Sequence, residues 1–370
     1  MKRFLHAVAT LSGLSIGVGI FGVPFVTAQV GFKVGMFWIA LVGLLVIAVH
    51  LFYGEVVAAT AGKHRLPGYV GRVMGPHAKQ IVMITDLVRF WGLQLAYLIV
   101  GGTFLSLLLT PYFGGDSFLY SLILFAFVAL STLFGLRFVN RIEFVLTWFL
   151  LGAILLIVGR AVPHIQIENL LAFGKGSFFL PYGIIIVALG GAPAIPEMWD
   201  ILRGRKKMFR AAILVGTLIP ILVTGLFTFA IVGVTGSGTS LEAVEGLRGA
   251  LGARIVTLGA FAGFLAILTS YLVIALYMQE MLRYDFLVKR SLAWGFAVSI
   301  PLLLFLIGAH NFIEVIDIIG SVLFGIEGII ILVASVLIMR RRKTSARGIK
   351  IGIAIIVGLC FALGVIQKLV

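Results

Sequence analysis

Two clusters of glycine and proline are the part of this sequence whose spacing points most directly to chemistry. The first reads Ser-Ile-Gly-Val-Gly-Ile-Phe-Gly-Val-Pro over residues 15–24, and the second reads Ala-Leu-Gly-Gly-Ala-Pro-Ala-Ile-Pro-Glu over residues 188–197. Both contain Gly-x4-Pro, as Gly19 to Pro24 and as Gly191 to Pro196. Inside a helix, Gly costs about 1 kcal/mol and Pro about 3 kcal/mol relative to Ala. Each cluster therefore predicts a break in a helix.

A break of this kind leaves backbone groups free to bind a ligand. Half-helices that begin near Gly19 and Gly191 would aim free N–H groups and the positive ends of their dipoles at the break, which suits a carboxylate. Half-helices that end near Ile16 and Leu189 would offer carbonyl oxygens, which suit an ammonium group or a cation. A zwitterionic amino acid satisfies both kinds of end.

Acidic and basic residues inside apolar segments form a second candidate site. Glu55, Asp86, Arg89 and Glu197 all lie about six to nine residues from the same end of their segments, so they could meet. We expect either an inner gate or a permanently paired structural cluster, with Arg89 as the partner of one acid. Glu327 lies near the middle of its segment with no basic residue close in sequence. It is either the carrier of a coupling proton or a carboxyl bonded to a neighbouring helix.

The composition shows which solvent surrounds these residues. Of 370 residues, 61% are hydrophobic and 12% are charged, whereas soluble domains are about 25% charged. A bilayer is the alternative solvent, spanned by runs of roughly 20 apolar residues. Cys360 is the only cysteine, which excludes a disulfide framework and a cysteine-based metal site. The histidines show no ligand spacing, so we expect no cofactor and no metal beyond a possible Na⁺.

We predict an all-α membrane protein that forms one domain over residues 1–370. Eleven spans are expected, at about 5–29, 34–61, 80–109, 118–136, 142–160, 178–203, 209–234, 253–280, 292–309, 312–339 and 351–368.

The distribution of Lys and Arg supports this number of spans. With a cytoplasmic N-terminus, 22 of the 29 basic residues fall on the inside, mainly in the segments 63–79, 203–210, 283–290 and 340–350. The net charge of +15 thus reflects topology and not nucleic-acid binding. The prediction is a multi-pass protein of the plasma membrane with its N-terminus in the cytoplasm and its C-terminus outside.

The positions of the two breaks predict an inverted repeat. They lie in spans one and six, so the second broken helix comes five spans after the first, and the two cross the membrane in opposite directions. The repeats would cover residues 5–160 and 178–339, with an additional helix at 351–368. The alternative is that the glycines serve helix packing and the prolines only kink the helices.

Several segments resemble prokaryotic members of the amino acid/auxin permease family. They are Ile16–Pro24, His50–Val57, Pro181–Glu197, Asn311–Ile313 and Gly325–Gly328. That family belongs to the amino acid–polyamine–organocation superfamily and has the LeuT-type fold. The resemblance covers nearly the whole chain. It implies an amino acid carrier that works by alternating access, coupled to Na⁺ or H⁺.

The resemblance also implies particular site residues. The substrate-binding positions would be Gly17, Val18 and Gly19 in the first break and Ala188, Gly190 and Gly191 in the second. Gln94 in span three, with its neighbours Trp91 and Tyr97, would line the substrate side or pack between helices instead.

A sodium site is implied by the hydroxyl pair Thr269 and Ser270 in span eight, completed by carbonyls of about Gly13 and Ile16. Hydroxyl and carbonyl oxygens suit a hard cation, but Ser and Thr also bond to carbonyls of their own helix. Some proton-coupled relatives replace sodium by a Lys in span five. Residues 142–160 contain none, so Glu327 is the candidate for a proton.

Other classes of protein remain as alternatives. A membrane enzyme should show a cluster of His, Asp or Cys at one face, and a LeuT-type metal carrier should bear Asp and Asn in the first break and Met beside the second. The breaks here hold Gly, Val, Ala and Pro. A carrier of another small solute and a non-transporting sensor stay open. The expected partners are an amino acid and the lipid bilayer, and the sequence assigns no oligomeric state.

Overall fold

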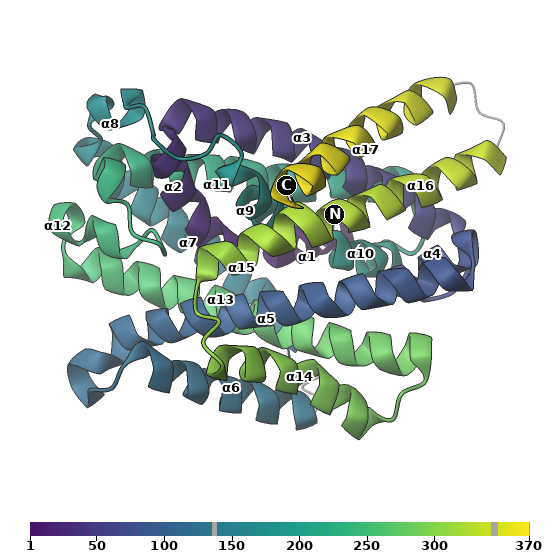
Figure 1. Ribbon diagram of the computed structural model, residues 1–370, viewed down its shortest axis with the longest axis horizontal. Coiled ribbons are helices and arrows are strands. Elements are labelled where there is room, and N and C mark those ends of the chain that lie inside the picture. The colour runs from purple at the N-terminus through teal and green to yellow at the C-terminus, as the bar shows by residue number, and fades with distance from the viewer. Residues whose placement is uncertain (135–138, 342–346, 370) are drawn as a thin grey trace.

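A computed structural model describes residues 1–134, 139–341 and 347–369, and Figure 1 shows these parts as a bundle of helices that run mostly along one direction. Eight of the predicted spans are single helices: α3 (Phe32–Ala59), α5 (Pro76–Phe113), α6 (Ser117–Phe134), α7 (Val139–Ala161), α11 (Lys206–Thr235), α13 (Ala253–Phe286), α14 (Arg290–Leu306) and α17 (Arg347–Leu369).

The number of spans agrees with the prediction. Among the described residues, seven helical segments are long and apolar enough to cross a membrane, or up to eight if a bent pair at the N-terminus counts as one span. Three shorter apolar helices, at Ser117–Leu133, Trp148–His164 and Arg290–Leu306, match the remaining predicted spans. The predicted all-α fold class is confirmed. The bounds of the two repeats and of the additional helix stay a prediction.

Both predicted breaks are present. In the first span, α1 (Lys2–Ser15) and α2 (Gly19–Val30) are bent by 53° to each other. In the sixth, α9 (Leu180–Leu189) ends before Gly190, and a 3₁₀ turn, η2 (Ala192–Ala194), leads into α10 (Ile195–Ile201).

A third irregular span was not predicted. The tenth span begins as α15 (Phe312–Ile318), widens into the π-helical turns of η5 (Ile319–Phe324) and continues as α16 (Gly325–Arg341). Gly320 lies directly against α9, because a Cβ there would come within 3 Å of backbone atoms of Gly183. The π turn thus lies where two spans approach closely, and such turns are frequent at functional sites.

Short elements cap the two ends of the bundle. One end carries α4 (Leu66–Met74), and the other carries α8 (Ile167–Leu171), α12 (Arg248–Leu251) and the turns η1 (Val162–His164), η3 (Gly236–Gly238) and η4 (Glu245–Leu247). Large apolar side chains remain exposed on the flank of the bundle, for example Leu359, Leu363 and Ile366 on α17. Exposed apolar side chains on a membrane helix fit contact with lipid.

The basic segments gather at the end of the bundle that carries α4. Lys63 pairs with Asp200 at 2.9 Å, Arg65 pairs with Glu280 at 2.6 Å, and Lys350 pairs with Glu55. These contacts hold residues of two basic segments, 63–79 and 340–350, at this end, and we call it the basic face. Arg137, Arg342 and Lys343 lie outside the described residues.

We expect the basic face to be cytoplasmic, and exposed positions at the two ends allow a direct test. In a Cys360→Ala background, Arg205→Cys places a thiol at the basic face and Gly249→Cys places one on α12 at the opposite end. An impermeant thiol reagent should label Gly249→Cys in intact cells and should label Arg205→Cys only after permeabilisation. The reverse pattern would overturn the orientation.

Candidate functional site

The two breaks touch each other in the centre of the bundle. A Cβ on Gly19, the first residue of α2, would lie only 2.6 Å from the N and Cα atoms of Ala188 near the end of α9. Only glycine permits this approach of one backbone to another. The prediction that the two breaks lie together is therefore supported by direct contact, with Gly19 and Ala188 as the point of contact.

His50 on α3 holds the second break in place. The backbone N–H of Gly191 donates to His50 Nε2 at 3.3 Å, and His50 Nδ1 lies 2.9 Å from Thr217 Oγ1. Thr217 uses its own hydroxyl hydrogen on the carbonyl of Ile213. His50 must therefore donate from Nδ1 and accept at Nε2, which fixes its neutral tautomer. The sequence analysis gave this histidine no role.

Gly191 is enclosed on its other side by the end of α1. A Cβ there would lie 2.3 Å from Ser15 Oγ. Ser12, also on α1, donates to the carbonyl of Gly216 on α11 at 3.0 Å. The second break is thus held among α1, α3 and α11, and Gly191 lies behind the site and not on its surface.

A cavity of about 20 Å³ lies between the breaks. Gly17, Val18, Gly19 and Gly190 line it, so four of the predicted substrate-binding residues meet there. The other lining residues are Leu14, Ser15, Arg89, Leu93, Tyr97, Val187, Pro193, Ile274 and Phe324. This volume admits about one water molecule, so a bound amino acid requires the walls to move apart.

The prediction for Gln94 is corrected by the structure. Its side-chain nitrogen lies 3.5 Å from Met278 Sδ on α13, and Leu93 and Tyr97 line the cavity in its place. Trp91 donates to the carbonyl of Phe296 on α14. The resemblance identified the correct helix, but neighbouring positions of a helix point about 100° apart, and its rotation depends on packing.

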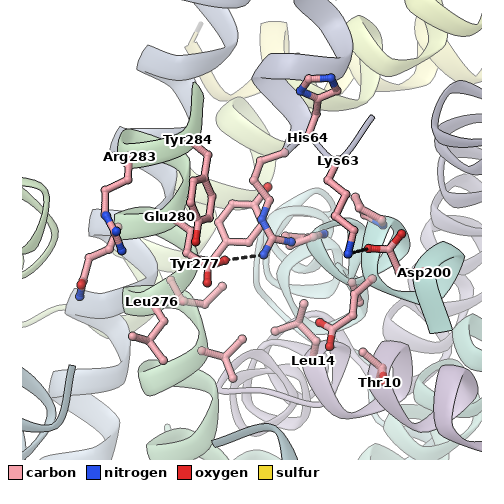
Figure 2. Close-up of a pocket in the computed structure, with 18 of the residues that line it drawn as sticks. Thr10, Leu14, Lys63, His64, Asp200, Leu276, Tyr277, Glu280, Arg283 and Tyr284 are labelled. Atoms are coloured by element: carbon pink, nitrogen blue, oxygen red, sulfur yellow. Dashed lines mark hydrogen bonds and ion pairs between the residues drawn. The ribbon is translucent and has the colours of Figure 1, made fainter. Parts of the chain in front are cut away.

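A second cavity, of about 700 Å³, connects the site to the basic face. Leu14, Pro193 and Ile274 line both cavities. The mouth is charged, and Lys63 reaches Asp200 across it (Figure 2). The guanidinium of Arg65 lies 4.7 Å from the ring centre of Tyr277. Burial lowers the pKa of Arg65, but Tyr277 and the hydrogen bond to Glu280 outweigh it and hold the pKa above its ordinary value, so Arg65 stays charged.

Toward the opposite end, aromatic side chains close the path. The ring of Phe21 packs edge-on against the rings of Phe104 and Phe227, with ring centres 5.0 Å and 6.0 Å apart respectively. All three are buried. The structure is therefore open toward the basic face and closed toward the other, as expected for one end state of a carrier with a central site.

The predicted group of gate residues is only partly formed. Arg89 Nη2 contacts Asp86 Oδ1 at 2.8 Å, but Glu55 pairs with Lys350 and with Arg210 at 3.7 Å. Glu197 lines the large cavity. The prediction that all four residues meet is wrong, because depth along a helix fixes the level of a side chain and not its direction.

Glu327, which the sequence placed apart, is the second partner of Arg89. Its Oε2 lies 3.0 Å from Arg89 Nε. The guanidinium also lies 4.2 Å from the ring centre of Phe90 and 4.7 Å from that of Phe324. We call Asp86, Arg89 and Glu327 the buried triad. The sequence signal was that each is a charged residue within an apolar span.

Of the two predicted sodium-binding hydroxyls, that of Thr269 is bonded within its own helix and that of Ser270 lies at the first break. Thr269 donates to carbonyls of its own helix, at 3.1 Å to Leu265 and 3.0 Å to Ala266. Ser270 lies at the first break, where a Cβ on Gly17 would be 3.6 Å from its hydroxyl oxygen. Gly13 and Ile16 belong to the last turn of α1 and the residue after it. Among the described residues, no three His, Cys, Asp or Glu side chains gather as a metal site.

Facing breaks, a central cavity and access from one end together define a membrane transporter. The model of the tryptophan/tyrosine permease family matches residues 1–370. The chain belongs to this family and is a permease, not an enzyme. Its family is thus a different grouping from the amino acid/auxin permeases that it resembles in sequence.

Individual relatives agree with this assignment. The chain is 24% identical to a tyrosine-specific transport system 1 of Haemophilus influenzae over 82% of its own length and 80% of the relative. It is 21% identical to a glutamine transporter 2 of Aliivibrio fischeri over 90% of its own length and 88% of the relative.

Solved structures show the fold. MhsT in complex with L-phenylalanine matches with a TM-score of 0.71 at 14% identity, covering 98% of both chains. A manganese transporter from Eremococcus coleocola matches with a TM-score of 0.70 at 13% identity, covering 98% of this chain and 86% of the other. The fold alone therefore does not decide the substrate.

Gly17 offers a substitution that tests the cavity without disturbing the fold. A methyl group there would meet Tyr97 Oη at 3.5 Å and Ser270 Oγ at 3.6 Å, which are ordinary contact distances. Gly17→Ala should therefore fold and yet narrow the site, lowering substrate affinity by about tenfold, equivalent to about 1.4 kcal/mol. Equilibrium binding to the purified protein measures this loss.

Gly152→Ala is the matched control, because a Cβ at Gly152 meets nothing within 4 Å. It should bind substrate as the unmodified protein does. Unchanged affinity in Gly17→Ala would show that the substrate does not use this cavity.

Proposed function

We propose that this chain is a secondary active transporter of aromatic amino acids that works by alternating access, coupled to a gradient of Na⁺ or H⁺. The observation that carries the proposal is the meeting of two helix breaks at one cavity that is reached from one face only. The coarser statement, that the chain is an amino acid permease, follows from its family.

The ends of the broken helices support a zwitterionic substrate. Gly19, the first residue of α2, lines the cavity, and so do Leu14 and Ser15 at the end of α1. A carboxylate is stabilised at a helix N-terminus, and an ammonium group is stabilised by the carbonyls at a C-terminus. Both kinds of end are present within one cavity.

The walls support an apolar or aromatic side chain. Val18, Leu93, Val187, Ile274 and Phe324 line the cavity. Such walls favour apolar side chains because burial of apolar surface drives binding. The family description and the tyrosine-specific relative point the same way. The glutamine transporter among the relatives makes a polar side chain the competing outcome.

We infer that H⁺ and not Na⁺ is the coupling ion. The hydroxyl hydrogen of Thr269 is used within its own helix, although its oxygen keeps lone pairs that a cation can use. Glu327 lies fully buried beside the cavity. A buried carboxyl can take up a proton directly.

Uptake into proteoliposomes tests the function. Labelled L-tyrosine and L-tryptophan should accumulate above the equilibrium level when an inward H⁺ gradient is imposed, and a protonophore should abolish this accumulation. Thr269→Val combined with Ser270→Ala serves as the control for sodium and should leave H⁺-driven accumulation in place. Accumulation of labelled L-glutamine but not of either aromatic amino acid would contradict the substrate class. Accumulation that requires Na⁺ and is lost in the double variant would overturn the preference for H⁺.

A further inference from the structure

Two carboxyl groups share one guanidinium in the buried triad. Asp86 contacts Arg89 at 2.8 Å and Glu327 contacts it at 3.0 Å, through different nitrogen atoms. The three residues are 1%, 2% and 4% exposed, for Asp86, Arg89 and Glu327 respectively. With all three ionised, the triad carries one uncompensated negative charge away from water, which is strongly unfavourable. Binding of one proton removes it.

The carboxyl oxygens of the triad leave room for that proton. Asp86 Oδ2 is buried and has no hydrogen-bond partner, and Glu327 Oε2 has only the ion-pair contact with Arg89 Nε. Carboxylates that compete for one positive charge hold a proton more readily than a carboxylate with its own partner.

Arg89 links the triad to the substrate cavity, because it lines that cavity together with Gly17, Val18 and Gly19. A guanidinium binds carboxylates through paired N–H groups. Because Gly19 at the start of α2 lines the same cavity, a substrate carboxylate held there also contacts Arg89 and competes with Glu327 for it. When Glu327 loses that counter-charge, its neutral, protonated form becomes the favoured one.

Glu327 is better placed than Asp86 to exchange its partner. Asp86 lies one helical turn from Arg89 on α5 and moves with it. Glu327 lies on α16, next to the π-helical turns of η5, so the contact between Glu327 and Arg89 joins two different spans.

We propose that the buried triad is the proton-binding site of the transporter, and that Glu327 takes up one proton as the substrate carboxylate replaces it on Arg89. The inference rests on the proposed function and adds the residues that would couple the proton to the substrate. It predicts that proton and amino acid bind together, each strengthening the binding of the other.

Other titratable groups lie on the elements around Glu327. They are His50, Tyr53 and Glu55 on α3, Tyr69 on α4, Tyr277 on α13, and Lys350, Cys360 and Lys368 on α17. Lys350 is paired with Glu55, and Lys368 with Asp317. His50 already uses both ring nitrogens, so protonating it would break its bond to Gly191. Because Lys350, Lys368 and His50 already have partners, we assign the proton to the triad.

Binding of L-tyrosine to the purified full-length protein at about pH 5 to 8 tests the inference. Uptake of one proton with the substrate should tighten Kd by up to tenfold for each unit that the pH falls. Addition of L-tyrosine to weakly buffered protein should also withdraw protons from solution, as a pH-indicator dye would report.

Glu327→Gln is the decisive variant. It keeps the shape of the side chain and leaves Asp86 and Arg89 as a balanced pair, so the protein should fold, which its melting temperature verifies. Its affinity should be independent of pH, and L-tyrosine should withdraw no protons. Glu327→Asp should restore part of the pH dependence.

Asp317→Asn is the matched control. Asp317 is a buried acid in the same span, paired with Lys368 at 2.6 Å, and its replacement should preserve the pH dependence. A wild-type pH dependence in Glu327→Gln, or none in the wild type, would overturn this inference and leave the proposed function intact. Absence of saturable binding of L-tyrosine and L-tryptophan at every pH would contradict the proposed function itself.

Discussion

The constraint on which this structure depends is that a backbone N–H or C=O group inside a membrane must have a partner. Two spans lose their helical hydrogen bonds near the middle of the span, so the backbone groups at each break need partners that the helix no longer supplies. The second break receives them from His50 through the amide of Gly191. The contact of Gly19 with Ala188 brings the first break against it. Gly17, Val18, Gly19 and Gly190 of the two breaks line a cavity, where a substrate can bond to their backbone groups.

The same contacts divide the bundle into two parts with the cavity between them. Hydrogen bonds from Ser12 to Gly216 and from His50 to Thr217 tie together α1, α3 and α11, and the Gly191 amide adds the second break to this part. The facing wall comes from α5 and α13, which contribute Leu93, Tyr97 and Ile274. The guanidinium of Arg89, on α5 in that wall, contacts Glu327 on α16. Movement of one part against the other would open and close the path to the cavity and change the contacts of the triad together.

The sequence was sufficient for features that depend on local composition. Span number follows from apolar length, and the breaks at Gly17–Gly19 and Gly190–Gly191 follow from the cost of glycine and proline in a helix. Features that depend on helix rotation were not predictable. Gln94 packs on Met278 and not toward the cavity, and Glu55 pairs with Lys350 and not with Arg89. His50 contacts Gly191, 141 positions away, and Arg89 contacts Glu327, 238 positions away. No local sequence pattern predicts contacts between residues so far apart in the chain.

In the proposed transport cycle, one substrate occupies both breaks at once. Hydrogen–deuterium exchange of the purified protein, with and without saturating L-tyrosine, measures this directly, because exchange slows where an amide gains a hydrogen bond or loses access to water. We expect slower exchange both in peptides that contain Val18–Ile20 and in peptides that contain Gly190–Ala192, with the Gly152 region unchanged as an internal reference. Protection of one break alone, or of neither, while L-tyrosine is bound would contradict it.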